Sequence, residues 1–203
     1  MRKYDMAHTL AKVIFGIATV FRPTKVYGRE NIPEGPAVIC ANHVHNSDPF
    51  YILGAFPRKE RVWIMAKEEI SRWPVVGPAL NWFGFLIWVR RGKADVGAVK
   101  AALKALKGGE KLLIFPEGTR NDEIGDGKTG AAMMAIRARV PIIPVHISGE
   151  RGPFTPVKIH IGQAYLPFTE DRKATSEDYQ AATDVMMTKI KVLGERTGQE
   201  ARP

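Results

Sequence analysis

The chain has 203 residues and a formal net charge of +9, with 45% apolar and 25% charged residues. This length and composition predict one domain with a full hydrophobic core and exclude a largely disordered protein. The excess of Lys and Arg favours an anionic partner, such as a lipid surface, a phosphorylated substrate or an acidic protein. The single cysteine, Cys40, excludes a disulfide framework and a thiolate metal cluster.

The first 25 residues combine a basic start with an apolar run. Arg2 and Lys3 precede an apolar stretch over residues 6–21, which Lys12 interrupts. The uncharged part is shorter than the roughly 20 apolar residues of a membrane-spanning helix. No small-residue cleavage site of a signal peptide follows it. We therefore expect an interfacial amphipathic helix at residues 1–25 that lies on a membrane. An ordinary helix packed on the core is the alternative.

Strand-like and helix-like patterns alternate along the rest of the chain. In chain order the pattern predicts a strand at 36–41, a helix that begins at Pro49, a helix at 95–106, a strand at 111–115, a helix at 130–139, strands at 140–147 and 157–161, and a helix at 176–193 with Ser176 as its N-cap. Such alternation predicts an α/β single domain with a largely parallel central sheet flanked by helices. Sites in these sheets lie at the carboxyl ends of strands.

Residues 73–89 form an uncharged stretch of a different kind. Pro74, Pro78 and Gly84 interrupt it at a spacing that disfavours a helix. We interpret the stretch as an apolar wall or a shallow membrane contact, and a buried core segment is the alternative.

The stretch CANHVHNSDPF at residues 40–50 holds two histidines and an aspartate. A tight turn after the predicted strand would bring Asp48 against the imidazole of His43. The carboxylate would then fix the tautomer and leave the other ring nitrogen as a base. One alternative makes Asp48 only a helix cap and His43 a loop residue. Another is a metal site of His43, His45 and Asp48, which the absence of ligand spacing among the other histidines disfavours.

The stretch FPEGTR at residues 115–120 follows another predicted strand. It places a carboxylate (Glu117), a glycine that permits close approach (Gly118) and a guanidinium (Arg120) in one loop. Arginine suits a phosphate group, which it can bind with two parallel hydrogen bonds. A surface ion pair between Glu117 and Arg120 is the alternative.

Together these stretches resemble blocks of the glycerolipid acyltransferases, the family of 1-acyl-sn-glycerol-3-phosphate acyltransferases. Four blocks match in order, over about residues 27–162. They are Asn42-His43 with Asp48 (Asn-His-x4-Asp), GFLIWVR at 84–90 (Gly-x5-Arg), FPEGTR at 115–120 and VPIIPV at 140–145. The resemblance implies transfer of a fatty acyl group from acyl-CoA or acyl-carrier protein to the sn-2 hydroxyl of 1-acylglycerol-3-phosphate. This reaction makes phosphatidic acid in phospholipid biosynthesis, without a cofactor or a metal.

The resemblance also implies roles for individual residues, with His43 as the base and Asp48 as its partner. The substrate-binding residues would be Lys67, Arg90, Glu117, Gly118, Thr119 and Arg120. Residues 26–203 would form the catalytic domain. The partners would be the acyl donor, a lysophosphatidate-type acceptor and an anionic membrane surface. The protein would lie at the cytoplasmic face of the cell membrane as a peripheral or monotopic protein. Nucleic acid is not expected, because no basic helix with interleaved aromatic residues is present.

Three departures from the family pattern leave the exact acceptor open. His45 stands where many members have serine, Gly127-Lys128-Thr129-Gly130 stands where many have Phe-Lys-x-Gly, and Val89 stands where many have aspartate. Another lysolipid acceptor, either a lysophospholipid or a lyso-aminolipid, is therefore an alternative. A catalytically silent lipid-binding member of the fold is another.

Overall fold

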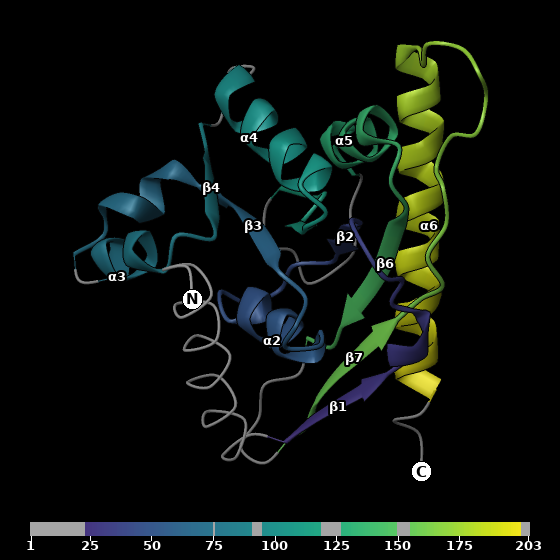
Figure 1. Cartoon of the computed structure of the whole chain (residues 1–203). Coiled ribbons are helices and arrows are strands. Elements are labelled where there is room, and N and C mark those ends of the chain that lie inside the picture. Colours follow the sequence, from purple (N-terminus) through teal and green to yellow (C-terminus); the bar gives the residue numbers. More distant parts are fainter. Residues whose placement is uncertain (1–22, 75, 91–94, 119–126, 150–154, 200–203) are drawn as a thin grey trace.

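The computed structural model describes residues 23–74, 76–90, 95–118, 127–149 and 155–199. A seven-stranded sheet crosses the molecule and helices pack on both of its faces (Figure 1). The strands are β1 (Thr24–Tyr27), β2 (Val38–Ala41), β3 (Val62–Lys67), β4 (Leu86–Val89), β5 (Lys111–Ile114), β6 (Ile142–Ile147) and β7 (Val157–Ile161). The α-helices are α2 (Asp48–Ala55), α3 (Val76–Phe83), α4 (Val96–Lys107), α5 (Gly130–Ala138) and α6 (Ser176–Gln199), and the 3-10 helices are η1 (Arg29–Asn31) and η2 (Glu68–Arg72).

The sheet has the strand order β1-β7-β6-β2-β5-β3-β4. Neighbouring strands are parallel throughout, except for the antiparallel pair of β6 and β7. The predicted α/β domain with a largely parallel sheet is therefore confirmed. β2 and β5 are neighbours, and Cys40 pairs with Ile114 near their carboxyl ends. The loops that follow these two strands, which carry His43 and Glu117, consequently leave the sheet at the same edge.

The described residues form two large core clusters, one on each face of the sheet, and a smaller cluster around Ala132, Ile136 and Ala182. Alternate residues of the central strands point to opposite faces, so Ile39 and Leu113 pack with α2, whereas Val38 and Leu112 pack with α4, α5 and α6. The central strands β2 and β5 are buried along their whole length. This explains their continuous apolar sequences, which are typical of parallel sheets covered on both faces.

The prediction that the spacing over residues 73–89 disfavours a helix is wrong, because this stretch contains the helix α3 and the strand β4. Pro78 is compatible with α3 because it is the third helical residue, where a backbone N–H has no acceptor within the helix. Gly84 then ends the helix with a φ of 69°.

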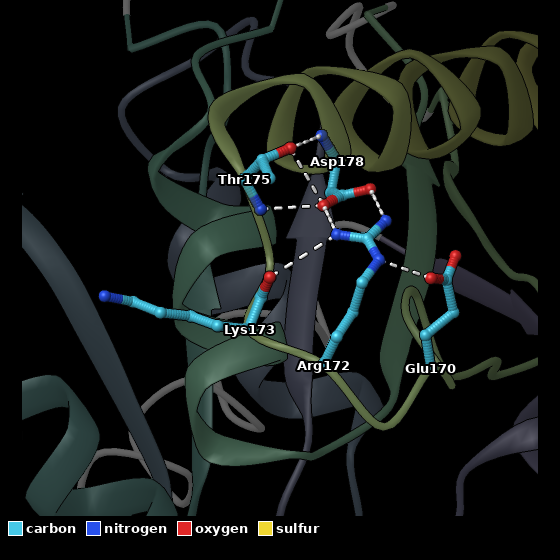
Figure 2. Close-up of polar contacts among 5 residues, drawn as sticks. All are labelled: Glu170, Arg172, Lys173, Thr175 and Asp178. Carbon is cyan, nitrogen blue, oxygen red and sulfur yellow. Dashed lines mark hydrogen bonds and ion pairs between the residues drawn. The ribbon is translucent and has the colours of Figure 1, made fainter.

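The start of α6 is held by a group of polar contacts that Figure 2 shows. Thr175, and not Ser176 as predicted, caps the helix: its backbone N–H donates to Asp178 Oδ2 (2.7 Å), and its Oγ1 accepts from the Asp178 backbone N–H (3.4 Å). Arg172 donates to both oxygens of Asp178 at 2.7 and 2.8 Å. These bonds from Arg172, together with the amide of Thr175, hold the pKa of Asp178 well below its usual range.

An N-terminal helix is predicted for residues 1–25, and residues 1–22 of this range lie outside the described residues. Residues 24 and 25 belong to β1, so the sheet domain begins slightly earlier than the predicted boundary at residue 26. In the part of the chain that the structure describes, no helix combines the length and the apolar character needed to cross a membrane.

Candidate active site

His43 and Asp48 meet in the tight turn between β2 and α2. Nδ1 of His43 lies 3.1 Å from Oδ2 of Asp48, which confirms the predicted contact. The same oxygen accepts the backbone N–H groups of Val44 and His45, both at 2.7 Å. The predicted role of Asp48 as the cap of a helix that begins at Pro49 is wrong. Asp48 is itself the first residue of α2, and its carboxylate turns back onto the preceding turn.

This arrangement determines which nitrogen of His43 is basic. A carboxylate only accepts hydrogen bonds, so Nδ1 carries a hydrogen and Nε2 of the neutral ring is left with its lone pair. Asp48 is fully buried, whereas the His43 side chain is 18% exposed. The ring of His43 also stacks on Phe115, with centroids 4.1 Å apart and an interplanar angle of 24°. The residues thus form a fixed base with a buried anionic partner.

Two long-range contacts fix the turn against β6 and the residues that follow it. Asn42 Nδ2 donates to Ile147 O (3.0 Å), and Asn42 Oδ1 accepts from Ile147 N (2.8 Å). His45 Nε2 lies 2.8 Å from Gly149 O, and because a carbonyl only accepts, this nitrogen is the donor. The two histidine rings therefore contact different partners. In the described ranges, no three His, Cys, Asp or Glu residues form a group that could hold a metal ion.

A cavity of about 690 Å³ lies beside His43. Its volume falls within the range of small-molecule binding pockets. Its wall includes polar or charged side chains, namely those of His43, Asn46, Lys67, Arg90, Asp95 and Lys128. Apolar side chains form most of the remainder, among them Ile64, Met65, Trp73, Leu80, Phe85, Val99, Ile114 and Met134. Such a wall suits a ligand with one anionic group and a long apolar part.

The predicted substrate-binding residues are only partly brought together. Lys67, Arg90 and Gly118 line the cavity with His43. The Arg90 guanidinium also pairs with Glu68 (Nε to Oε2, 2.9 Å) at the surface. Glu117 is 6% exposed and is not among the residues that line the cavity. The predicted residues Thr119 and Arg120 lie outside the described residues.

Lys128 is a cavity residue to which the sequence analysis gave no role. Its side chain crosses directly over Gly118: a Cβ on that glycine would lie 3.1 Å from Lys128 Nζ and 3.3 Å from its Cε. The Lys128 backbone N–H donates to Pro116 O (2.9 Å), which ties this segment to the FPEG turn. Gly118 has a φ of 69°, so glycine there provides both the backbone conformation and the space for Lys128. The lysine in the Phe-Lys-x-Gly comparison was the available signal in the sequence.

Cys40, the residue before Ala41 at the end of β2, is fully buried. Burial raises the pKa of its thiol far above the usual range, because the thiolate would lose its hydration. A nucleophilic role for this thiol is therefore disfavoured.

The fold and the site define a class of protein: an α/β domain with an oriented histidine base beside a largely apolar cavity. A comparison with models of protein families shows which family within this class the chain belongs to. The model of the acyltransferase family matches residues 23–148, which is more than half of the chain. The chain therefore belongs to the acyltransferase family, and the resemblance drawn from the four sequence blocks is confirmed.

Individual relatives carry more specific names. The chain is 32% identical over 155 residues to the 1-acyl-sn-glycerol-3-phosphate acyltransferase of Pseudomonas aeruginosa, covering 71% of this chain and 55% of the relative. It is 28% identical over 182 residues to the protein of the same name in Bacillus subtilis, covering 86% and 90%. The crystal structure of the 1-acyl-sn-glycerophosphate acyltransferase PlsC from Thermotoga maritima aligns with a TM-score of 0.68 at 26% identity, covering 98% of this chain and 80% of that one. The chain spans about half the length of several curated relatives. The matched region covers 55% of the Pseudomonas aeruginosa protein and 42% of a chloroplastic relative from Brassica napus.

Proposed function

We propose that this protein is an O-acyltransferase that moves a fatty acyl group from an acyl thioester to the sn-2 hydroxyl of 1-acylglycerol-3-phosphate. The product would be phosphatidic acid, for phospholipid biosynthesis. The observation that carries the proposal is the 3.1 Å contact between His43 Nδ1 and Asp48 Oδ2 on the wall of a largely apolar cavity. Membership of the acyltransferase family and the names of the relatives support the choice of reaction and acceptor.

In the proposed mechanism, Nε2 of His43 removes the proton of the acceptor hydroxyl while the oxygen attacks the thioester carbonyl. The tetrahedral intermediate collapses with cleavage of the C–S bond, and the imidazolium returns its proton to the departing thiolate. Asp48 stabilises the imidazolium and holds the ring in the productive tautomer. A thioester is already an activated acyl group, so the reaction needs no acyl-enzyme intermediate. Positioned general-base catalysis typically contributes about 10²- to 10⁴-fold.

The wall of the cavity supports a division of the substrate into two parts. Lys67, Arg90 and Lys128 bring positive charge to the wall, where they would bind the acceptor phosphate through charge-assisted hydrogen bonds. The resemblance adds Glu117, Gly118, Thr119 and Arg120 to this acceptor site. The apolar wall would hold an acyl chain, since burial of each CH₂ group is favourable by about 0.8 kcal/mol.

The donor in this proposal is acyl-CoA or acyl-carrier protein, and the protein acts at the cytoplasmic face of the cell membrane. The net charge of +9 supports an acidic carrier protein as donor and a location at the membrane, because it attracts the carrier protein and anionic lipid head groups alike. The protein would bind the membrane peripherally or monotopically, with residues 1–25 as an interfacial helix.

Purified full-length protein should be assayed against 1-acylglycerol-3-phosphate, a lysophospholipid and a lyso-aminolipid, each with acyl-CoA and acyl-carrier-protein donors. Mass spectrometry of the extracted lipids should show a diacyl product from 1-acylglycerol-3-phosphate. His43→Ala should reduce kcat by at least about 10²-fold. His45→Ala, the matched change two residues away, should stay within a few fold of wild type, because Asn42 still ties the turn to Ile147. A product from another lysolipid alone would replace the acceptor. No acyl product from any acceptor would leave a silent lipid-binding protein and refute the proposal.

A further inference from the structure

We propose that an apolar surface, made of the exposed face of α3 (Pro78, Ala79 and Trp82) and of the exposed residues Trp73 and Pro74 that precede the helix, docks onto an anionic lipid bilayer with both indole rings in the interfacial region. This surface, here called the α3 surface, is separate from residues 1–25. The inference rests on the proposed function, because a lysolipid acceptor is the reason for a bilayer to lie against this part of the molecule.

The first observation is the exposure of two tryptophans in one short segment. Trp73 is 47% and Trp82 is 49% exposed. Pro78 and Ala79 are also exposed, and they precede Trp82 by four and three residues, so the three side chains share one face of α3. No charged residue occurs from Trp73 to Val89. In contrast, the exposed valines of α6, Val185 and Val192, lie among Asp184, Lys189, Lys191 and Glu195.

The second observation is that the α3 surface is held in place. The Gly77 backbone N–H donates to Trp73 O (2.9 Å), and a Cβ on Gly77 would lie only 2.1 Å from Ser71 O. The start of α3 therefore packs against η2 with no space for a side chain. Trp88 Nε1 donates to Asn81 Oδ1 (2.8 Å), which ties the helix to β4. The apolar face is consequently presented to solvent by a rigid element.

The third observation is the charge at both ends of the uncharged segment. Arg72 precedes it and Arg90 follows it, and the side chain of each is 75% exposed. Both guanidinium groups pair with Glu68, so they lie together at one margin of the surface. Tryptophans beside exposed basic residues are typical of segments in a membrane interface, where the ring enters the head-group layer and the cation contacts lipid phosphate.

The fourth observation joins the surface to the cavity. Trp73 is half exposed, yet it also lines the cavity together with Leu80 of α3 and with His43. Figure 1 shows α3 at the outer end of the sheet, beyond the edge strand β4. A bilayer against this face would let the acyl chain of a lysolipid enter the cavity past Trp73 without crossing bulk water. This continuity favours a lipid surface over a protein partner.

The tryptophan content of the chain allows a direct test on the full-length protein. All four tryptophans, Trp63, Trp73, Trp82 and Trp88, lie outside residues 1–25, so their fluorescence is insensitive to anchoring by the N-terminus alone. Vesicles of phosphatidylcholine and phosphatidylglycerol with brominated acyl chains should quench the emission of the wild-type protein. The Trp73→Phe/Trp82→Phe variant should lose most of this quenching. Trp63→Phe is the matched control and should keep it, because Trp63 is bonded to Glu110 and is only partly exposed. Absence of quenching in the wild type, or equal quenching in the double variant, would overturn the proposal.

An activity measurement separates failure of docking from failure of the proposed function. Trp82→Asp, which changes a residue outside the cavity wall, should lower kcat/KM about tenfold with the acceptor in vesicles, since one interfacial side chain is lost. It should leave the rate with a short-chain acceptor in monomeric solution unchanged. Val185→Asp on α6 is the matched control and should change neither rate. If Trp82→Asp lowers activity with the monomeric acceptor, and does so only when acyl-carrier protein is the donor, the surface binds that protein. This result would overturn bilayer docking. Quenching without turnover of any lysolipid would keep the docking and reject the proposed function.

Discussion

Replacement of Asp48 by Asn separates the charge of this residue from its hydrogen bonds. In the structure, Oδ2 of Asp48 accepts from His43 Nδ1 and from two backbone N–H groups at 2.7 Å. Those two donors require an acceptor, so the carboxamide oxygen of the variant must occupy the place of Oδ2. The ring of His43 then keeps its hydrogen on Nδ1. The expected loss arises from the missing negative charge and not from a reversed tautomer.

The geometry sets the size of the effect. For unit charges 3.1 Å apart, an effective dielectric constant of about 20 gives an attraction of about 5 kcal/mol between the carboxylate and the imidazolium. This is an upper limit of about 10⁴-fold in kcat. The amide dipole and water near a ring that is 18% exposed restore part of the stabilisation. We therefore expect Asp48→Asn to lower kcat by about 10²- to 10⁴-fold, with little change in the KM of either substrate.

Steady-state kinetics should be measured alongside the melting temperature, so that loss of fold is distinguished from loss of charge. Asp178→Asn is the matched control, because Asp178 also accepts a backbone N–H at 2.7 Å but lies at the start of α6. This control should keep the wild-type kcat. A folded Asp48→Asn variant within about threefold of the wild-type kcat would refute the argument, since about 0.6 kcal/mol is far below the predicted electrostatic loss.

Three further outcomes are expected. Lys128→Met should raise the KM of the acceptor about 10- to 100-fold through loss of a charged hydrogen bond and leave the KM of the donor unchanged. Lys128→Arg should retain most of the affinity for the acceptor. Equal effects of Lys128→Met on both KM values would exclude specific phosphate binding. Gly118→Ala should lower the free energy of unfolding by about 1–2 kcal/mol because of its φ of 69°, and it should also raise the acceptor KM by displacing Lys128; an unchanged melting temperature would contradict this. Burial, together with the charge of His160, lowers the pKa of His146 from 6.5 to about 4. The unfolded chain therefore takes up this proton first as the pH falls, so stability should decrease between about pH 6.5 and pH 4, by up to about 3 kcal/mol; urea unfolding of His146→Gln should show a smaller decrease, and an identical pH dependence would assign the effect to other groups.

The strands β2, β5, β6 and β7 were predictable from sequence, whereas the edge strands β1 and β4 and the interior strand β3 were not predicted. β2 and β5 have continuous apolar sequences because both of their faces are covered, and such a signal needs no knowledge of neighbours. The edge strands β1 and β4 are partly exposed and only four residues long, so they offered little periodicity. α3 was not predictable from its proline and glycine content alone, because these residues break a helix only in its interior. Pro78 lies in the first turn, where proline is tolerated.

The candidate site divides in the same way. The contact of His43 with Asp48 was predictable, because it depends on five residues of local chain. The place of Lys128 was not predictable, because it depends on a contact with Pro116, which is 12 positions earlier in the chain. His45 could not be assigned from sequence either, since its partner Gly149 is distant in the chain and loop geometry decides the contact.

The double hydrogen bond of Asn42 with Ile147 has a consequence for synthesis of the protein. These residues are separated by 105 positions, and His45 and Gly149 by 104. At about 5–20 residues per second, a ribosome delivers the partners of this turn roughly 5–20 seconds after the turn itself. The nascent chain therefore carries His43 without its anchors until β6 has emerged and paired with β2. The site is consequently completed late, and a chain interrupted before residue 147 would lack the contacts that set its geometry.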